Sequence, residues 1–162
     1  MAPPADLLPA TAPFESDVQR PIAFLQGVAH SISQIFFKGD GVAALLILAG
    51  LAINSRAAAL FALGGAILAV ITAHIFGVES GLITSGLQGF SPVLAAVAFG
   101  TVFYRPSLRG AGYAALATVA TVICQSALDA LLAPYMLPPL SAPFDLVALI
   151  FFLPRNGPAN PD

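Results

Sequence analysis

The side chains that could do chemistry in this sequence are a few hydroxyl and amide groups that stand beside prolines and glycines. Ser141 lies in LPPLSAPF at residues 137–144, and a looser version, LPATAPF, occupies residues 8–14. Because serine caps helices and proline is tolerated in their first turn, LPPLSAPF predicts the start of a short helix, with Ser141 as the capping hydroxyl and Pro143 just inside it. The N-terminus of such a helix offers partial positive charge and free N–H donors, which suits a polar solute.

The titratable residues do not indicate catalysis. His30 and His74 are isolated, no acidic residue interrupts the long apolar runs before Asp129, and Cys124 is the single cysteine. One cysteine excludes an intramolecular disulfide framework and a cysteine-based metal cluster. We therefore expect no metal, no cofactor and no enzymatic activity. The formal net charge of -2 gives no basic patch, so we expect no nucleic-acid partner.

The composition decides in which solvent these groups must act. Hydrophobic residues make up 58% of the chain and charged residues 9%, with a mean hydropathy of +0.90. A soluble domain of this length could not cover its surface with so few polar groups. We expect an all-α integral membrane protein that crosses the cell (plasma or inner) membrane several times, with the lipid bilayer as its surroundings.

Apolar runs between charged turns predict about five transmembrane or half-membrane helices, some of them broken or re-entrant. The runs are, in chain order, 21–37, 42–53, 57–76, 87–104, 111–136 and 145–154. Crossing the hydrocarbon takes roughly 20 residues, so 57–76 should span completely and 145–154 only about half. The run 42–53 is either a tilted span completed by flanking residues or a piece that enters from one side. The run 21–37 is polar enough for an interfacial or pore-lining helix.

Charges and prolines divide the chain further. Arg56, Arg105 and Arg109 should share one side of the membrane, which the positive-inside tendency assigns to the cytoplasm, and Glu79 should face the other side. Residues 1–20 form a Pro-rich, loosely ordered segment, 21–154 the membrane domain and 155–162 a polar tail.

Three breaks fall inside or beside the apolar runs, and they carry the functional argument. Ser91-Pro92, the prolines of LPPLSAPF, and the glycines around Asp40 each interrupt a helical pattern. Backbone that leaves the helix at membrane depth must be buried in protein or line a watery cavity. Many transporters build their solute sites from such broken helices.

Three segments, SISQIFF, GLQGFSPVLAAVAFG and LPPLSAPF, together resemble the second half of a bacterial urea transporter, over residues 21 to about 154. The resemblance implies one inverted-repeat half of a fold in which two halves enclose a narrow pore, usually assembled as a trimer. It implies passive, channel-type passage of urea or a similar small neutral amide past flat aromatic slots and oxygen acceptors.

The resemblance also assigns five candidate pore residues. Gln34 matches the polar residue that hydrogen-bonds urea near a pore mouth, and Phe37 matches one wall of an aromatic slot. Phe90 matches the opposing wall and Leu94 an apolar wall residue. Ser141 matches the threonine whose hydroxyl lines the centre of the pore. The alternative for the two phenylalanines is that they pack in the core.

Members of the family are about twice as long, so the resemblance implies that a second half must complete the pore. Three interpretations stay open: a half that pairs with an inverted copy or a separate half, a fragment or deletion product, and a remnant that is a non-conducting structural membrane protein. Thr11-Ala12-Pro13-Phe14 is either a relic of a first half or a chance match. The permeant could be urea, another short amide or ammonia. If the half-pore interpretation is right, the five residues should converge on one open, concave face with Ser141 at its deep end.

Overall fold

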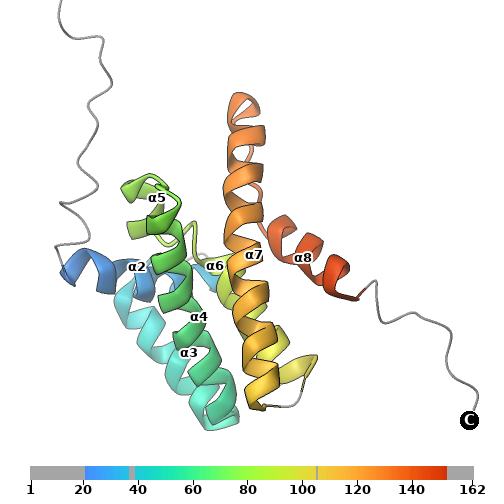
Figure 1. Cartoon of the computed structure of the whole chain (residues 1–162). Helices are drawn as coiled ribbons and strands as arrows, with labels where there is room; N and C mark the ends of the chain where they lie inside the picture. The colour runs from blue at the N-terminus through green and yellow to red at the C-terminus, as the bar shows by residue number, and fades with distance from the viewer. Residues whose placement is uncertain (1–20, 37–38, 105, 153–162) are drawn as a thin grey trace, which may run out of the picture.

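The computed structural model describes residues 21–36, 39–104 and 106–152, and within these ranges every regular element is helical (Figure 1). The all-α prediction is confirmed for this part of the chain. The elements are α2 (Pro21–Ser33), the 3₁₀ turn η2 (Gln34–Phe36), α3 (Gly41–Asn54), α4 (Arg56–Ile75), α5 (Ser80–Thr84), α6 (Phe90–Val97), the π-helical η3 (Ala98–Val102), α7 (Leu108–Leu132), the 3₁₀ turn η4 (Ala133–Tyr135) and α8 (Ala142–Phe152).

Short polar side chains in the connections set where three of these helices begin. The carboxylate of Asp40 starts α3 by accepting a hydrogen bond from a backbone N–H in the first turn, at 3.1 Å. The hydroxyls of Ser55 and Ser107 do the same for α4 and α7, at 3.3 and 3.1 Å. Ser55 also ends α3, because its own N–H donates to a carbonyl of that helix. A single extended residue therefore reverses the chain between α3 and α4.

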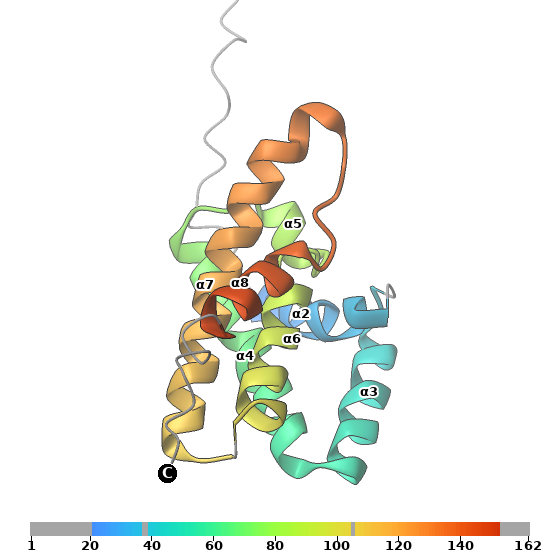
Figure 2. The ribbon, with the colours of Figure 1, turned by 90° about the vertical axis from the view of Figure 1, so that its right-hand side faces the viewer.

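The long helices α4 and α7 run side by side, and α6 packs against both of them (Figures 1 and 2). Helix α3 returns along α4, and α8 packs on α7 and α6. Helix α2 lies crosswise to α3 and α4 and reaches the short helix α5 and the start of α6. Because α2 lies crosswise, its C-terminal end lies beside the break between α5 and α6.

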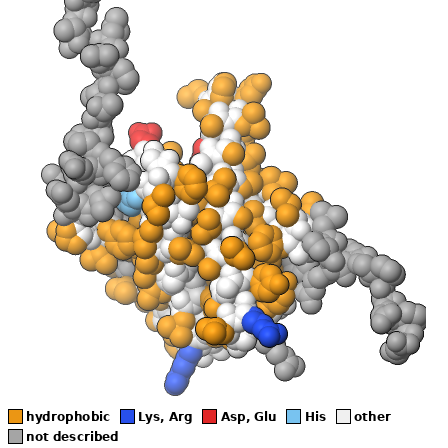
Figure 3. Space-filling view, in the orientation of Figure 1, with side chains coloured by type: hydrophobic (Ala, Val, Ile, Leu, Met, Phe, Trp, Pro, Cys, Tyr) orange, Lys and Arg blue, Asp and Glu red, His pale blue; other side chains and the backbone are white. Residues whose placement is uncertain are grey.

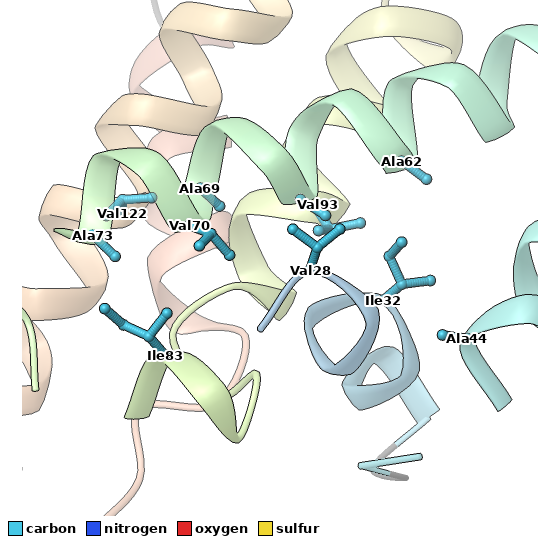
Figure 4. Packing of buried hydrophobic residues seen from close by; sticks show 11 residues of the cluster. Val28, Ile32, Ala44, Ala62, Ala69, Val70, Ala73, Ile83, Val93 and Val122 are labelled. Carbon is cyan, nitrogen blue, oxygen red and sulfur yellow. The ribbon is translucent and has the colours of Figure 1, made fainter. Parts of the chain in front are cut away.

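The main core is a face of small residues on α4. Ala62, Ala66, Ala69 and Ala73 recur at helical spacing and are at most 1% exposed. They pack on branched side chains from the crosswise and broken helices, namely Val28, Ile32, Ile83 and Val93 (Figure 4). Small residues allow membrane helices to approach closely, which replaces the hydrophobic driving force that lipid does not provide.

Among the described residues, two helices are long and apolar enough to cross a membrane. The ranges are Arg56–Ile75, with a mean hydropathy of 2.1, and Leu108–Tyr135, with 1.7. Fewer than half of the residues in each are buried inside the chain, and large apolar side chains such as Leu60, Ile67 and Leu116 point outward. Outward-facing leucine and isoleucine on a long helix suit contact with lipid.

The apolar run at 87–104 does not form one continuous α-helix. The helix begins at Phe90, and α6 and η3 have eight and five residues. Together they rise roughly 20 Å, less than the hydrocarbon thickness of about 30 Å. The chain turns at 85–89 because glycines there, with Gly86 at φ +79°, permit backbone shapes that other residues resist.

The described arginines and Glu79 lie at opposite ends of the molecule, as expected. Arg56 opens α4, Arg109 lies in the first turn of α7, and both helices start at the lower end in Figure 3, where the two blue side chains stand. Glu79 precedes α5 at the other end. Arg105 lies outside the described residues.

Candidate functional site

A cavity of about 290 Å³ lies where the end of α2, the break before α6, the end of α7 and the segment before α8 meet. Its polar lining comes from Gln34, Gln125 and Asp129, and its aromatic wall from Phe90. Leucines of the α5 region and the stretch 136–140 supply the remaining surface. Segments far apart in the sequence therefore form one concave site.

The end of α2 is fastened to the break between α5 and α6 by two side chains. The Gln34 amide nitrogen donates to the carbonyl oxygen of Ser85, 51 positions away, at 3.0 Å. His30 Nδ1 lies 2.7 Å from the carbonyl oxygen of Thr84. These carbonyls lie where helix α5 ends, so the side chains satisfy backbone acceptors that the broken helix leaves without helical partners. The bond also fixes the Gln34 amide.

Two glycines allow this close crossing. A Cβ added at Gly86 would overlap the backbone of His30, and one added at Gly89 would overlap the Ser31 hydroxyl. Helix α2 therefore touches the backbone of the break directly. Because α6 starts at the next residue after Gly89, the contact also positions Phe90.

The structure brings two of the five predicted site residues together. Gln34 and Phe90 line the same cavity, and Phe90 is 8% exposed. Leu94 lies one turn along α6, is half-buried, and is not part of the cavity lining. Phe37 lies outside the described residues, as do residues 1–20 with Thr11-Ala12-Pro13-Phe14.

Ser141 differs from its expected place. It is exposed and does not line the cavity, so the expectation of a hydroxyl at the deep end is not met by the described residues. Its hydroxyl donates to the carboxylate of Asp145 at 3.3 Å, instead of capping a backbone N–H. The carboxylate of Asp145, one helical turn away, is a charged and therefore strong acceptor for this hydroxyl. Helix α8 nevertheless starts directly after Ser141, with Pro143 in its first turn.

The segment before α8 is held against the start of α6. The Ser91 hydroxyl, which is fully buried, donates to the carbonyl oxygen of Leu140 at 3.0 Å. Leu140 and Met136 both have positive φ angles, 50° and 53°, which non-glycine residues rarely adopt. Both line the cavity. Such backbone persists where surrounding contacts fix it, and it concentrates at functional sites.

Sequence reasoning missed two polar residues of the cavity wall. Gln125 and Asp129 lie one turn apart on α7, and the Gln125 amide nitrogen is 3.4 Å from both carboxylate oxygens of Asp129. Gln125 is 3% exposed, and its buried carbonyl oxygen has no hydrogen-bond partner among the described residues. The signal in the sequence is a glutamine and an acid four positions apart at the end of a long apolar run, which places both on one helical face.

A second, more polar depression of about 400 Å³ adjoins the cavity. Gln26, His30, Thr84 and Ser85 contribute to its lining, and Gln34 lines both hollows. The polar depression presents amide, imidazole and carbonyl groups, and the adjoining cavity presents the aromatic wall of Phe90. Oxygen acceptors beside a flat apolar wall can hold a small planar solute that carries N–H donors. Among the described residues no three His, Cys, Asp or Glu side chains gather as metal ligands.

Broken helices around a small polar and aromatic cavity, on a scaffold with two membrane-length helices, are typical of helical membrane proteins. The family profile described as "Urea transporter" matches residues 2–156, so the chain belongs to the urea transporter family. This confirms the family resemblance and extends the matched range beyond 21–154. Membership also agrees with the expectation that the chain is not an enzyme, and it places the protein in a membrane.

Curated relatives carry the same family name. The chain is 27% identical over 151 residues to "Urea transporter 1" of Ovis aries and equally to that of Capra hircus, covering 90% of this chain and 38% of each relative. The Rattus norvegicus "Urea transporter 1" is 27% identical over 145 residues, covering 86% of this chain and 36% of the relative. The chain thus spans well under half the length of the curated relatives it matches.

Proposed function

We propose that the chain supplies one half of a passive, channel-type pathway for urea or a similar small neutral amide across the cell membrane. Family membership supports this function, and one geometric observation carries it. Gln34 and Phe90, which the family resemblance assigns to the pore, come from separate elements and line a single cavity. No local packing rule requires two side chains so far apart in the sequence to meet.

In the proposed passage, the solute contacts the groups that line the cavity one after another. The Gln34 amide is oriented by its bond to Ser85, and its oxygen accepts from a solute N–H. Phe90 offers a flat face against which a planar molecule slides with little loss of contact. The family resemblance assigns the opposing wall to Phe37 and an apolar wall to Leu94. Ser141, which lies outside this cavity, contributes its hydroxyl elsewhere along the completed path in this proposal. A thicker or charged solute loses its hydration without compensating contacts, so the slot selects for small, flat, neutral amides.

A second half completes the pore in this proposal. One set of pore residues gives one side of a path, and a complementary half or an inverted copy of this chain supplies the other side. The complete unit is either a homo-oligomer, a trimer by analogy with the family, or an assembly with that complementary half. The alternative is a split or truncated transporter that remains as a non-conducting structural membrane protein.

Stopped-flow light scattering on proteoliposomes tests the function. We expect urea flux above that of empty vesicles for the full chain, alone or with a first-half homologue. Flux equal to that of empty vesicles in both preparations would favour the non-conducting alternative and refute the proposal.

A pair of matched variants tests the role of Phe90. Phe90→Leu should lower selectivity for urea over dimethylurea, because the flat wall is lost while most of the volume remains. Phe99→Leu is the control: Phe99 is buried in the same helical segment, 1% exposed, and does not line the cavity. Each variant should lower the free energy of unfolding. Truncation of a buried Phe to Ala costs about 3–5 kcal/mol, and the loss for Phe→Leu should not exceed this. Equal selectivity in the two folded variants would mean that Phe90 is a core residue.

A further inference from the structure

The outer surface of the bundle carries a second hollow that the proposed pore does not use. An apolar groove of about 450 Å³ lies between α4 and α7, with a residue of α6 as its floor. Leu60, Phe61 and Gly64 form part of one wall, and Ala111 and Ala115 part of the other. The hydroxyl of Thr118, which also borders the groove, donates within its own helix at 2.7 Å. The groove therefore offers no free polar group to a ligand.

The groove begins at the end of the molecule that carries the described cations. Arg56 directly precedes the lining residue Ala57, and Arg109 lies two positions before Ala111. Both arginines are exposed, and Figure 3 shows the two blue side chains at the lower end of the molecule, apart from each other. Both stand in the first turn of a helix, where the backbone dipole adds positive potential. No described acid lies in the first three turns of either helix.

The length of the groove along α4 matches the thickness of one leaflet of a bilayer. Its lining on α4 runs from Ala57 to Leu68. At the rise of an α-helix this is about 17 Å. Half of the hydrocarbon core is about 15 Å. A hydrocarbon tail entering from the arginine end would therefore reach the middle of the membrane along the groove.

We propose that this groove binds an anionic diacyl phospholipid, with one acyl chain along the groove and the phosphate at the end of the groove that carries Arg56 and Arg109. Basic pockets between transmembrane helices are established sites for anionic lipid head groups in other membrane proteins. The neutral chain explains the apolar lining, and the anionic head explains why both cations stand at the mouth.

The dimensions and charges favour a lipid over another protein helix. A helix about 10 Å across fills about 400 Å³ per turn, so a groove of 450 Å³ holds little more than one turn. A second copy docked with its groove against this one in parallel orientation would also bring like charges together at the mouth. A lipid meets neither difficulty.

Glycine positions make the test sharp. A Cβ added at Gly64 or at Gly112 meets nothing within 4 Å, but only Gly64 lines the groove. Gly64→Leu therefore fills the groove without a clash in the bundle, and Gly112→Leu is the matched control. Ala115→Leu fills the groove from the facing wall. It gives an independent test if Gly64→Leu does not fold.

The full chain is incorporated into nanodiscs of equimolar phosphatidylglycerol and phosphatidylcholine with identical acyl chains, released into detergent, and analysed by native mass spectrometry. We expect preferential retention of phosphatidylglycerol. Because a basic residue at the surface contributes about a fivefold factor, Arg56→Ala with Arg109→Ala should cut that retention roughly 25-fold and leave phosphatidylcholine unchanged. Gly64→Leu and Ala115→Leu should reduce both lipids, and Gly112→Leu neither.

Equal retention of the two lipids by the unmodified chain would overturn the proposal. Unchanged retention in folded Gly64→Leu and Ala115→Leu would overturn it as well. If Gly64→Leu instead dissociates a dimer without changing the lipid ratio, the groove binds a second copy and the lipid assignment fails. The readout does not depend on urea flux, so failure here and failure of the proposed transport are distinguishable.

Discussion

The contact between α2 and the start of α6 should tolerate little added volume, and Gly89→Ala tests this. A Cβ at Gly89 would overlap the Ser31 hydroxyl. Ser31 is 1% exposed, and its hydroxyl donates to the carbonyl oxygen of Gly27 at 2.6 Å, so it has no room to retreat. The two helices must separate instead. Overpacking of this kind costs about 1–3 kcal/mol, and we expect the upper part of that range.

The partner substitution shows whether the clash is the cause. Ser31→Gly removes the overlapped atoms at a cost of about 1 kcal/mol for glycine in a helix and about 1 kcal/mol for the lost hydrogen bond. If the overlap alone destabilises Gly89→Ala, the double variant should be no less stable than Ser31→Gly. The coupling between the two positions should then be about 2 kcal/mol or more, well above the few tenths found for independent sites.

Unfolding by sodium dodecyl sulfate in mixed micelles, followed by circular dichroism, measures these stabilities. Gly112→Ala is the control, because its added Cβ contacts nothing; it should be neutral or stabilising by up to about 1 kcal/mol. A Gly89→Ala variant as stable as this control would refute the crossing, and so would strictly additive effects in the double variant.

Three further substitutions follow from contacts in the same bundle. Gly65→Ala should destabilise by about 1–3 kcal/mol in the same assay, because its Cβ would overlap a side chain of α6, whereas the adjacent Gly64→Ala should not; equal effects would contradict the α4–α6 packing. Ser91→Ala should cost about 1–3 kcal/mol and speed proteolysis of the segment before α8, since a carbonyl there loses its donor; unchanged proteolysis would contradict this. Asp40→Ala should cost about 0.5–2 kcal/mol, and Asp40→Asn much less, because only alanine lacks the capping oxygen.

Much of the helix layout could be predicted from the sequence, because apolar run length and short polar connections act locally. The runs at 42–53 and 57–76 match α3 and α4 to within one residue at each end. The start of α6 at Phe90 could not be predicted from the run at 87–104, because the chain turns where Gly86 and Gly89 meet α2. That contact depends on residues more than 50 positions away, and the pattern of apolar residues within the run does not indicate it.

The site was predictable only in part for the same reason. Gln34 and Phe90 were assigned through a family resemblance, and the fold brings them to one cavity. Gln125 and Asp129 were missed because an isolated glutamine and acid at the end of an apolar run look like an ordinary helix end. Ser141 was expected to cap a helix, but its hydroxyl donates a hydrogen bond to the carboxylate of Asp145.

The double use of Gln34 explains why an amide suits this position. Its nitrogen donates to the Ser85 carbonyl, which the end of α5 leaves without a helical partner, and its oxygen has no hydrogen bond from the described residues. An ionised carboxylate could accept from a solute but could not donate to Ser85, and an apolar side chain could do neither. In the proposed pathway the side chain that meets the solute is therefore also the one that satisfies the broken helix. Any change that releases it from Ser85 takes away the side-chain donor of a partly buried carbonyl, which costs about 1–3 kcal/mol. The chemistry of the site and the stability of the break are thus carried by one amide group.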